Sequence, residues 1–465
     1  MIRLYNSKTL QIEPFKPLKE GHVDMYVCGP TVYNYAHIGN ARPMVVFDVL
    51  KRLFEAEGYT VTYVSNFTDV DDKIINRAIE ENTTEAVIAQ RYIDAYQDLR
   101  RQLITHKPDI TPRVTETMDG IIAFIKDMVD NGSAYVSENG DVYFSVDADD
   151  DYGEISHQNL DMLEAGARID VNQGKRNPYD FALWKKTDKG IQWDSPWGKG
   201  RPGWHTECVV MINQNLGEII DIHGGGMDLK FPHHENEIAQ SECCNGVPFA
   251  KYWMHNGYIN VDNVKMSKSL GNFFTVRDVA EKYGYEPIRY LMISSQYRSP
   301  INYSVEIIEQ CKASLVRLYT CRDSLDFALQ NAGDTVPENA DEIKKQLDSR
   351  REQFCRAMDD DLNTADGIAA VFELVRDINV SVLESGSKEL VEYATKLFDE
   401  LTGVLGLVYN RKDENLDAEI EALIAARQEA RKAKNWAEAD RIRDELKAQG
   451  IILEDTPQGV KWHRA

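Results

Sequence analysis

The sequence predicts an α/β protein with a parallel-sheet core, an insertion within that core, a helical bundle and a small C-terminal α/β domain. Two observations predict this class. The chain opens with alternating strand and helix patterns, an order that builds a parallel sheet covered by helices. After residue 298, amphipathic helical spacing dominates instead. With 465 residues, 43% of them hydrophobic, the chain is long enough for several cores.

The first elements are expected in the order strand, helix, strand, helix. Residues 25–32 form a short apolar run, and residues 43–57 carry apolar side chains at helical spacing, with Pro43 suited to the first turn. Residues 59–66, rich in Tyr, Thr and Val, predict the second strand. An acidic loop at 68–72 then leads into a second helix. This order predicts a sheet of the nucleotide-binding type.

Later segments change in character. Residues of about 110–200 suggest an insertion, with two helical stretches and a strand near residues 141–144, and the core resumes near Gly203. Amphipathic spacing predicts bundle helices at 303–331, 340–359, 364–384 and 387–407. From Ala418 we expect one helix, a second helix through Lys447, and a strand pair within 451–462.

Composition limits the functional classes. The formal net charge of -23 argues against general DNA or RNA coating, which needs clustered Lys and Arg, so any nucleic-acid partner must meet local basic patches. Seven scattered cysteines indicate free thiols or metal ligands in a reducing compartment. Nothing at the start of the sequence resembles a signal peptide, and no run of about 18 apolar residues appears. We therefore expect a cytoplasmic enzyme with no membrane partner and no DNA partner.

Two distant segments together predict one split ATP site. His37, Gly39 and Asn40 lie where a predicted strand gives way to a helix, so backbone and helix N-terminus can meet phosphate. Far along the chain, a polar loop offers two cations and two hydroxyls to the charge that develops as pyrophosphate leaves. The loop residues expected to contact ATP are Lys265, Ser267, Lys268 and Ser269. Alone, either segment would indicate little; the loop by itself could be a solvated turn.

A second set of residues has metal-ligand character. Cys28 and Cys208 offer thiolates, and His233 and Glu237, spaced i and i+4 after Pro232, face one way on a helix. Together these four side chains would make a zinc site of mixed ligands, assembled by the fold. Taken singly, the cysteines could be ordinary buried residues and the histidine part of a helix cap. Cys28 lies nine residues before His37, which would place a metal beside the ATP site.

The C-terminal tail carries a weaker indication of nucleic-acid recognition. Basic residues cluster around Arg431, while Trp436, Asp440 and Asp455 offer a stacking surface and hydrogen-bond acceptors. Such groups read splayed single-stranded bases. A charge-laced exposed helix explains the same residues, and Trp436 and Trp462 could instead belong to a core.

Six segments in order resemble the motifs of cysteinyl-tRNA synthetases, a family of class I aminoacyl-tRNA synthetases. The resemblance covers the whole chain. It departs from the general class I pattern at Asn40, where that pattern has His. The six segments are residues 25–33, 66–73, 203–208, 221–226, 231–237 and 265–269.

The resemblance implies a Rossmann-type catalytic core that activates L-cysteine with ATP and Mg²⁺ and transfers it to the terminal adenosine 2′-hydroxyl of tRNA(Cys). It implies one Zn²⁺ per chain, bound by Cys28, Cys208, His233 and Glu237, that selects the substrate thiolate. His37, Asn40, Lys265 and Lys268 would be the catalytic residues. The residues expected around the bound cysteine are Thr68, Trp204, His223 and Asp228. A backbone-bonded loop histidine explains His223 equally well.

The resemblance also suggests boundaries and a monomeric enzyme. Arg431, Trp436, Asp440 and Asp455 would contact the anticodon. The expected domains are 1–110, first half of the core; 111–200, connective insertion; 201–272, second half of the core; 273–310, stem-contact region; 311–408, helical bundle; and 417–465, anticodon-binding domain.

Two alternatives remain from the residues alone. One is a ligase that activates cysteine with the same core but transfers it to a small amine; such a ligase would need no tail for reading an anticodon. The other is a non-enzymatic nucleic-acid binder with a structural zinc, which the net charge of -23 disfavours.

Overall fold

The computed structural model describes residues 1–157, 174–265, 274–410, 414–448, 451–456 and 459–464. It divides into two compact units: Met1–Ile308 with Ala357–Ala365, and Glu309–Arg356 with Asp366–Ala465. We describe each unit by itself. Among the helices that the structure describes, none is both long and apolar enough to cross a membrane.

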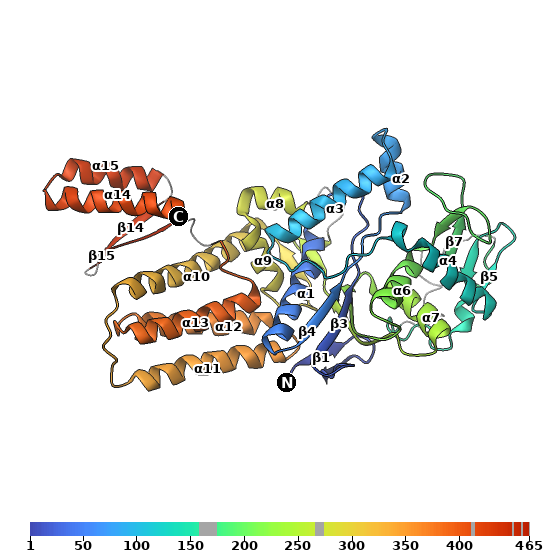
Figure 1. The fold of residues 1–465 in the computed structure, drawn as a ribbon, viewed down its shortest axis with the longest axis horizontal. Helices are drawn as coiled ribbons and strands as arrows, with labels where there is room; N and C mark the ends of the chain where they lie inside the picture. The colour runs from blue at the N-terminus through green and yellow to red at the C-terminus, as the bar shows by residue number, and fades with distance from the viewer. Residues whose placement is uncertain (158–173, 266–273, 411–413, 449–450, 457–458, 465) are drawn as a thin grey trace. The chain divides into compact units, whose positions relative to one another are not determined.

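A four-stranded parallel sheet forms the centre of the first unit (Figure 1). Its strand order is β10-β9-β3-β4, so strands from the two predicted halves of the core pair side by side, β3 with β9. This confirms the predicted parallel sheet. The strands are β3 (His22–Val27), β4 (Thr60–Val64), β9 (Ile220–Gly226) and β10 (Ala250–Asn256).

Helices cover both faces of this sheet. The helix α1 contacts β4, β9 and β10. On the opposite face, Tyr26 and Val64 of the sheet join one apolar core with side chains of α4, α6 and α7. The helices of the first unit are α1 (Ile38–Ala56), α2 (Asp72–Glu80), α3 (Glu85–Gln102), α4 (Val114–Asp130), α6 (Trp204–Asn215), α7 (Glu235–Asn245), α8 (Val276–Tyr283) and α9 (Tyr285–Ile293).

Smaller sheets complete the first unit. An antiparallel sheet of order β5-β6-β7-β8 lies in the chain between β4 and β9, where only one strand near 141–144 was predicted. The remaining strands are β1 (Arg3–Asn6), β2 (Gln11–Pro14), β5 (Ala134–Val136), β6 (Val142–Phe144), β7 (Phe181–Lys186), β8 (Gly200–Pro202), β11 (Ile259–Val261), β12 (Val264–Lys265) and β13 (Ile301–Tyr303).

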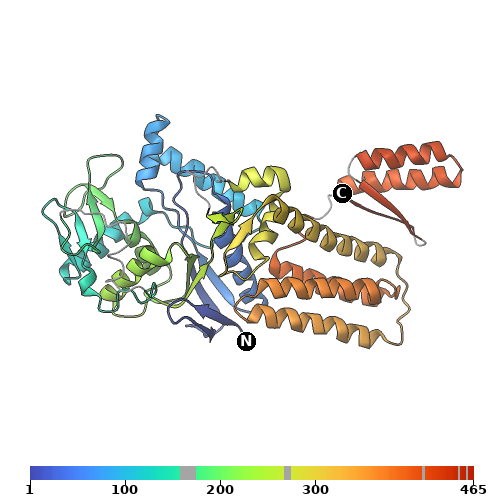
Figure 2. The same cartoon turned by 180° about the vertical axis from the view of Figure 1, so that it is seen from behind.

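The second unit contains long helices and a separate C-terminal core. Figure 2 shows the bundle helices and, at the C-terminus, two helices beside a strand pair. Ile420, Ile442 and Trp462 belong to that C-terminal core, so Trp462 is a core residue. The elements are α10 (Val305–Asn331), α11 (Ala340–Asp359), α12 (Thr364–Asp377), α13 (Lys388–Leu405), α14 (Glu414–Lys432), α15 (Trp436–Ala448), β14 (Ile451–Thr456) and β15 (Gly459–Arg464).

A buried carboxylate ties α1 to α9. Asp48 is 1% exposed and accepts hydrogen bonds from Arg289 Nη2 at 2.6 Å, Arg52 Nε at 2.8 Å and His106 Nδ1 at 2.7 Å. Burial alone would raise the pKa of Asp48, but Arg289, His106 and Arg52 together hold it below its usual range. This group fixes the helix whose N-terminus carries His37.

Replacing Asp48 by Asn should destabilise the first unit by about 3 kcal/mol at neutral pH, because Arg289 stays buried without its partner. The depressed pKa means that the contribution of Asp48 is complete above about pH 4, the value for an unfolded Asp, and is lost as the pH falls below it. Calorimetry of both proteins should therefore show a constant difference from neutral pH down to about pH 5, and a smaller one below about pH 4. A difference that grows on acidification would contradict this role.

Candidate active site and metal centre

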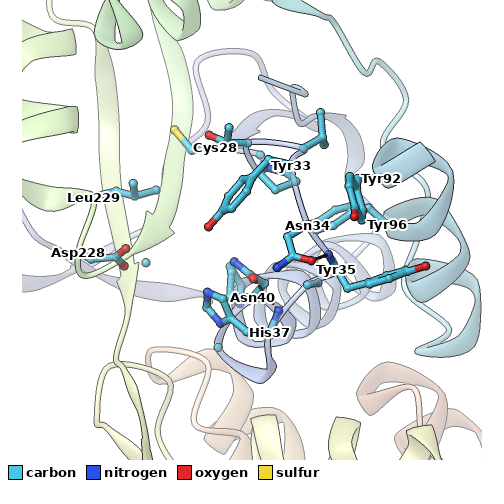
Figure 3. Close-up of a pocket in the computed structure, with 18 of the residues that line it drawn as sticks. Cys28, Tyr33, Asn34, Tyr35, His37, Asn40, Tyr92, Tyr96, Asp228 and Leu229 are labelled. Carbon is cyan, nitrogen blue, oxygen red and sulfur yellow. Dashed lines mark hydrogen bonds between the residues drawn. The ribbon is translucent and has the colours of Figure 1, made fainter. Parts of the chain in front are cut away.

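The predicted site residues gather where the parallel strands end. A pocket of about 520 Å³ is lined by residues at or after the ends of β3, β9 and β10, among them Cys28, His37, Asp228 and Asn256. The carboxyl ends of parallel strands commonly form ligand crevices. Figure 3 shows Cys28, Asp228 and Leu229 toward one end of this pocket, and His37 and Asn40 along one side.

Four side chains with metal-ligand chemistry meet at the buried end. The ligand atoms of Cys28, Cys208, His233 and Glu237 all lie within 4.8 Å of one another. The two sulfurs are 3.8 Å apart, and Cys208 Sγ lies 3.7 Å from His233 Nε2. Cys28 Sγ lies 3.7 Å from Glu237 Oε1. The structure thus brings together all four residues that the sequence suggested as ligands.

These distances fit a tetrahedral ion. Tetrahedral bonds of about 2.3 Å to sulfur and about 2.0 Å to nitrogen or oxygen separate two sulfurs by about 3.8 Å, and sulfur from nitrogen or oxygen by about 3.5 Å. Three of the separations agree. His233 Nε2 and Glu237 Oε1 are closer, at 2.7 Å, and would move apart by roughly 0.6 Å around an ion of that geometry.

A second combination shares two of the same residues. Cys28 and Glu237 also form a group with His223 and His234, and Cys28 Sγ lies 3.3 Å from His234 Nε2. This group has one sulfur, whereas the first has two. Because thiolates favour zinc, the first group is the better zinc site.

Two further histidines, His223 and His205, contact the ligands of the first group. His223 Nε2 lies 2.6 Å from Glu237 Oε2, which leaves Oε1 directed at the metal position. His205 Nδ1 lies 3.0 Å from His233 Nδ1, and Trp204 stacks on the His233 ring at 4.1 Å. Partners of this kind set the orientation and basicity of metal ligands.

The buried charges shift the pKa values of the group. Burial would raise the pKa of Glu237, but the nearby His233 and His223 lower it well below its usual range. Burial would lower the pKa of His233, but the Glu237 carboxylate raises it to about 10. Burial raises the pKa of the Cys28 thiol, whereas the hydrogen bond from Cys28 lowers that of Cys208. Binding of a metal would therefore release protons.

Close backbone packing holds Cys28 in place. Cys28 N donates to the carbonyl of Gly224 on β9, and Gly29 N donates to Asn66 Oδ1 at 2.8 Å. A Cβ on Gly29 would lie 1.6 Å from the carbonyl oxygen of Asn66, so the loop accepts only glycine there. The segment 28–37 can therefore pass directly over the ends of β4 and β9.

Asn40 has a structural task at the start of α1. Its Oδ1 accepts a hydrogen bond from the backbone N–H of His37 at 3.0 Å, and both residues line the pocket. The helix begins at Ile38, so Pro43 lies in the second turn and its predicted place in the first turn is wrong. Since Pro43 has no N–H, it cannot donate to the carbonyl of Gly39, a residue that lines the same pocket.

Replacing Asn40 by Ala should remove this acceptor and weaken the start of α1 by about 1 kcal/mol. Because His37 is held by the same bond, we expect a higher KM for ATP in pyrophosphate exchange. Asn40→Asp keeps an acceptor at the helix N-terminus and should retain more activity than Asn40→Ala. Equal losses in the two variants would contradict the capping role.

The second ATP segment is described only in part. The backbone of Lys265 ends β12, which pairs with β11. The side chain of Lys265 and the residues Ser267, Lys268 and Ser269 lie outside the described part of the chain. Their contribution to the ATP site stays a prediction.

The four residues expected around cysteine have different positions. Trp204 and Asp228 line the pocket, and Trp204 is 41% exposed. Thr68 is buried, and its hydroxyl donates to Glu207 Oε2 at 3.1 Å. His223 is fully buried and contacts Glu237. The structure therefore places two of these side chains at the pocket surface and two behind it.

Sequence reasoning missed several residues of this centre. Burial raises the pKa of Glu207 well above its usual value, and the Thr68 hydroxyl donates to this carboxyl group. His234 Nδ1 lies 2.8 Å from His255 Nε2, and His255 Nδ1 lies 2.8 Å from Ser7 Oγ. The sequence does contain one indication of these residues: five of the chain's ten histidines are clustered between residues 205 and 255.

The residues expected to read an anticodon lie on the C-terminal helices. Arg431 is in the last turn of α14, and Trp436 opens α15 with 59% of its surface exposed. Asp440 forms an ion pair of 3.1 Å with Arg443. The side chain of Asp455 is outside the described part of the structure.

Comparison with protein families matches almost the whole chain. Residues 14–313 match the model described as the class I (C) tRNA synthetase catalytic domain. Residues 353–409 match the DALR domain, and residues 413–462 match the anticodon-binding domain of cysteinyl-tRNA ligase. The match of the tail to an anticodon-binding domain does not favour the alternative of a ligase that transfers cysteine to a small amine. The catalytic-domain match does not favour the other alternative, a non-enzymatic nucleic-acid binder.

Solved structures with a similar fold are class I synthetases. A methionyl-tRNA synthetase from Mycobacterium tuberculosis, bound by methionyl-adenylate, aligns with a TM-score of 0.63 and 14% identity, covering 84% of this chain and 92% of that chain. A LeuRS in a ternary complex with tRNA, from Agrobacterium radiobacter, aligns with a TM-score of 0.62 and 12% identity, covering 85% and 86%. These likenesses show the fold.

Curated relatives share about half of their residues with this chain. A cysteine-tRNA ligase from Clostridioides difficile is 53% identical over 100% of both chains. Another from Caldicellulosiruptor saccharolyticus is 51% identical over 100% of both, and one from Geobacillus thermodenitrificans is 54% identical over 100% of this chain and 99% of its own. With the catalytic-domain match, this identity shows that the chain belongs to the cysteine-tRNA ligase family of class I synthetases.

Proposed function

We propose that this cysteine-tRNA ligase selects its amino acid through Zn²⁺ held by Cys28, Cys208, His233 and Glu237. The observation that carries the proposal is the meeting of these four donors beside the pocket that also contains His37. The reaction joins L-cysteine to tRNA(Cys) in two steps, through cysteinyl-adenylate and then the terminal adenosine 2′-hydroxyl.

Zinc suits the two-thiolate donor set and the substrate. Bound zinc would hold a cysteine thiolate far more tightly than a serine hydroxyl. A site built for the correct polar group reaches discrimination of about 10⁴ to 10⁵, against about 10² for packing alone. Selection of this strength makes an editing site unnecessary.

The protein's own groups would place the rest of the substrate. Asp228 lines the same pocket and carries the charge to hold the α-ammonium group of cysteine. Trp204, stacked on His233, forms a wall of the pocket. Thr68 and His223 act from behind this surface: His223 orients Glu237, and the Thr68 hydroxyl bonds Glu207.

ATP would bind along the N-terminal end of α1. His37, Gly39 and Asn40 line the pocket there, and the helix N-terminus favours phosphate, which would arrive as the Mg²⁺ complex of ATP. Lys265, Ser267, Lys268 and Ser269 would add positive charge and hydroxyls as pyrophosphate departs. Preorganised donors of this kind contribute most of the stabilisation in such reactions.

The tail would bind the anticodon. The exposed ring of Trp436 offers a stacking surface; Asp440 lies on the same helix, α15, and Arg431 in the last turn of α14. A contact of Asp455 with the anticodon stays a prediction from the sequence.

Pyrophosphate exchange measured with cysteine, serine and alanine tests this proposal. We expect exchange with cysteine, and a kcat/KM for serine that is at least about 10⁴-fold lower. The purified protein should contain about one zinc per chain. Equal exchange with cysteine and serine, or metal-free protein that retains full discrimination, would refute selection by zinc.

A further inference from the structure

We propose that the aromatic end of the pocket, formed by Tyr35, Tyr92 and Tyr96 with Tyr33 and Lys73 beside it, binds the 3′-terminal nucleotide of the tRNA. The base would stack on exposed tyrosine surface, and Lys73 would meet the adjacent phosphate. This inference rests on the proposed positions of cysteine and ATP, because it assigns the remaining end of the same pocket.

The pocket has an aromatic end apart from the metal group. Figure 3 shows Tyr35, Tyr92 and Tyr96 together at one end, Cys28 and Asp228 toward the other, and Tyr33 between them. All four tyrosines line the pocket. The rings of Tyr35 and Tyr92 meet edge to face, with centroids 5.3 Å apart.

The aromatic end is open to a flat ligand. Tyr35 keeps 41% of its surface exposed although it lies in a concave site. Tyr92 is 3% exposed and supports Tyr35 from α3. Bases stack on exposed aromatic rings regardless of sequence, so a rigidly backed tyrosine of this kind suits a terminal base.

Positive charge accompanies these rings. Lys73 Nζ lies 5.2 Å from the Tyr33 ring centroid, and the Arg277 guanidinium lies 5.8 Å from that of Tyr35. Lys73 is exposed, and no ion pair among the described residues involves it, whereas Arg277 Nε lies 3.3 Å from Glu281 Oε1. On a chain of net charge -23, an exposed lysine such as Lys73 marks where a phosphate can approach.

The reaction requires two nucleotides in the pocket at once. The adenylate would occupy the side with His37, Gly39 and Asn40, so the acceptor adenosine needs a second place within reach of the cysteinyl carbonyl. Figure 3 shows Tyr33 between the two ends, and Tyr33, Cys28 and His37 all line the same pocket. The aromatic end is therefore adjacent to the proposed reacting centre and separate from the helix N-terminus.

Tyr35→Ala, Tyr35→Phe and Lys73→Ala test the assignment. Preformed enzyme-bound cysteinyl-adenylate is mixed with intact tRNA(Cys), and the single-turnover transfer rate is measured beside cysteine-dependent pyrophosphate exchange. We expect Tyr35→Ala to slow transfer by about tenfold or more, the range for loss of one stacked base. Tyr35→Phe should transfer like the unchanged protein, and KM for ATP in exchange should rise less than about twofold.

A double-mutant cycle tests whether Tyr35 and the terminal adenosine of the tRNA contact each other. Binding of intact tRNA is compared with that of tRNA lacking its terminal adenosine, in the unchanged protein and in Tyr35→Ala. If Tyr35 stacks on that adenosine, the two losses are not additive. Lys126→Ala, an exposed substitution on α4 outside the pocket, is the matched control for Lys73→Ala and should leave transfer unchanged.

Two results would overturn the inference. Additive losses would place the terminal adenosine elsewhere, and a rise in KM for ATP as large as the fall in transfer would assign the aromatic end to ATP. Absence of cysteine-dependent exchange in the unchanged protein would instead refute the proposed function, so the two failures are distinguishable.

Discussion

Cys28→Ser should abolish metal binding and greatly weaken selection against serine. The serine hydroxyl is a far poorer zinc ligand than a thiolate, so metal content should fall from about one per chain to nearly none. Preference for cysteine over serine in pyrophosphate exchange should fall from at least about 10⁴ to about 10², the level that packing alone provides. Metal analysis and exchange with both amino acids measure the two effects.

Cys243→Ser is the matched control for this change. Cys243 lies on α7, the helix that carries Glu237, but its Sγ donates to the carbonyl of Ala148 and takes no part in the four-ligand group. The Cys243→Ser protein should therefore keep its bound metal and its preference for cysteine over serine. Unchanged selectivity in a metal-free Cys28→Ser protein would show that zinc does not recognise the substrate.

Removing residues 411–465 should raise the tRNA concentration needed for charging by about tenfold to a hundredfold, because exposed stacking and basic groups are lost. Exchange with cysteine should stay close to that of the full chain. The deleted segment has its own apolar core, made by Ile420, Ile424, Ile442, Leu446, Ile451 and Trp462. Keeping Asn410 preserves its hydrogen bond to the Tyr319 hydroxyl.

Trp436→Ala narrows the same test to one exposed side chain. Trp436 is 59% exposed, whereas Trp462 is buried in the C-terminal core, so the substitution should affect tRNA binding more than folding. If exchange fell as far as charging in the shortened protein, the tail would support the catalytic unit, and its proposed role in anticodon binding would be wrong.

The fold could be predicted where local pattern and tertiary packing agree. The strands β3 and β4 are rich in the residues that favour sheets, and among the amphipathic bundle helices α10 ends at Asn331 and α13 is followed by Gly406. The sheet of β5, β6, β7 and β8 was mostly missed, because three of these strands have only three residues and give no clear alternation. Because Pro43 suits a first turn, the helix α1 was predicted to begin at residue 43. It begins at Ile38, where the Asn40 side chain accepts a hydrogen bond from the His37 N–H.

The residue types of the site could be predicted from the sequence, but not which side chains lie at the pocket surface and which lie behind it. Thiolates and an i, i+4 pair indicated ligands, and the fold brings them within one group. Which side chains face the pocket depends on packing, so Thr68 and His223 were expected at its surface and lie behind it. Tyr35 and Tyr92 come from distant segments that meet only in three dimensions, and their spacing in sequence gave no indication of a shared site.

X-ray absorption at the zinc edge tests the central claim most directly, because it counts the sulfur ligands of the ion. In the protein alone, Cys28 and Cys208 should supply two sulfurs, with one nitrogen and one oxygen from His233 and Glu237. Adding L-cysteine should introduce a third sulfur at about 2.3 Å, while serine should leave the count at two. An unchanged sulfur count on saturation with cysteine would contradict recognition of the substrate thiolate by zinc.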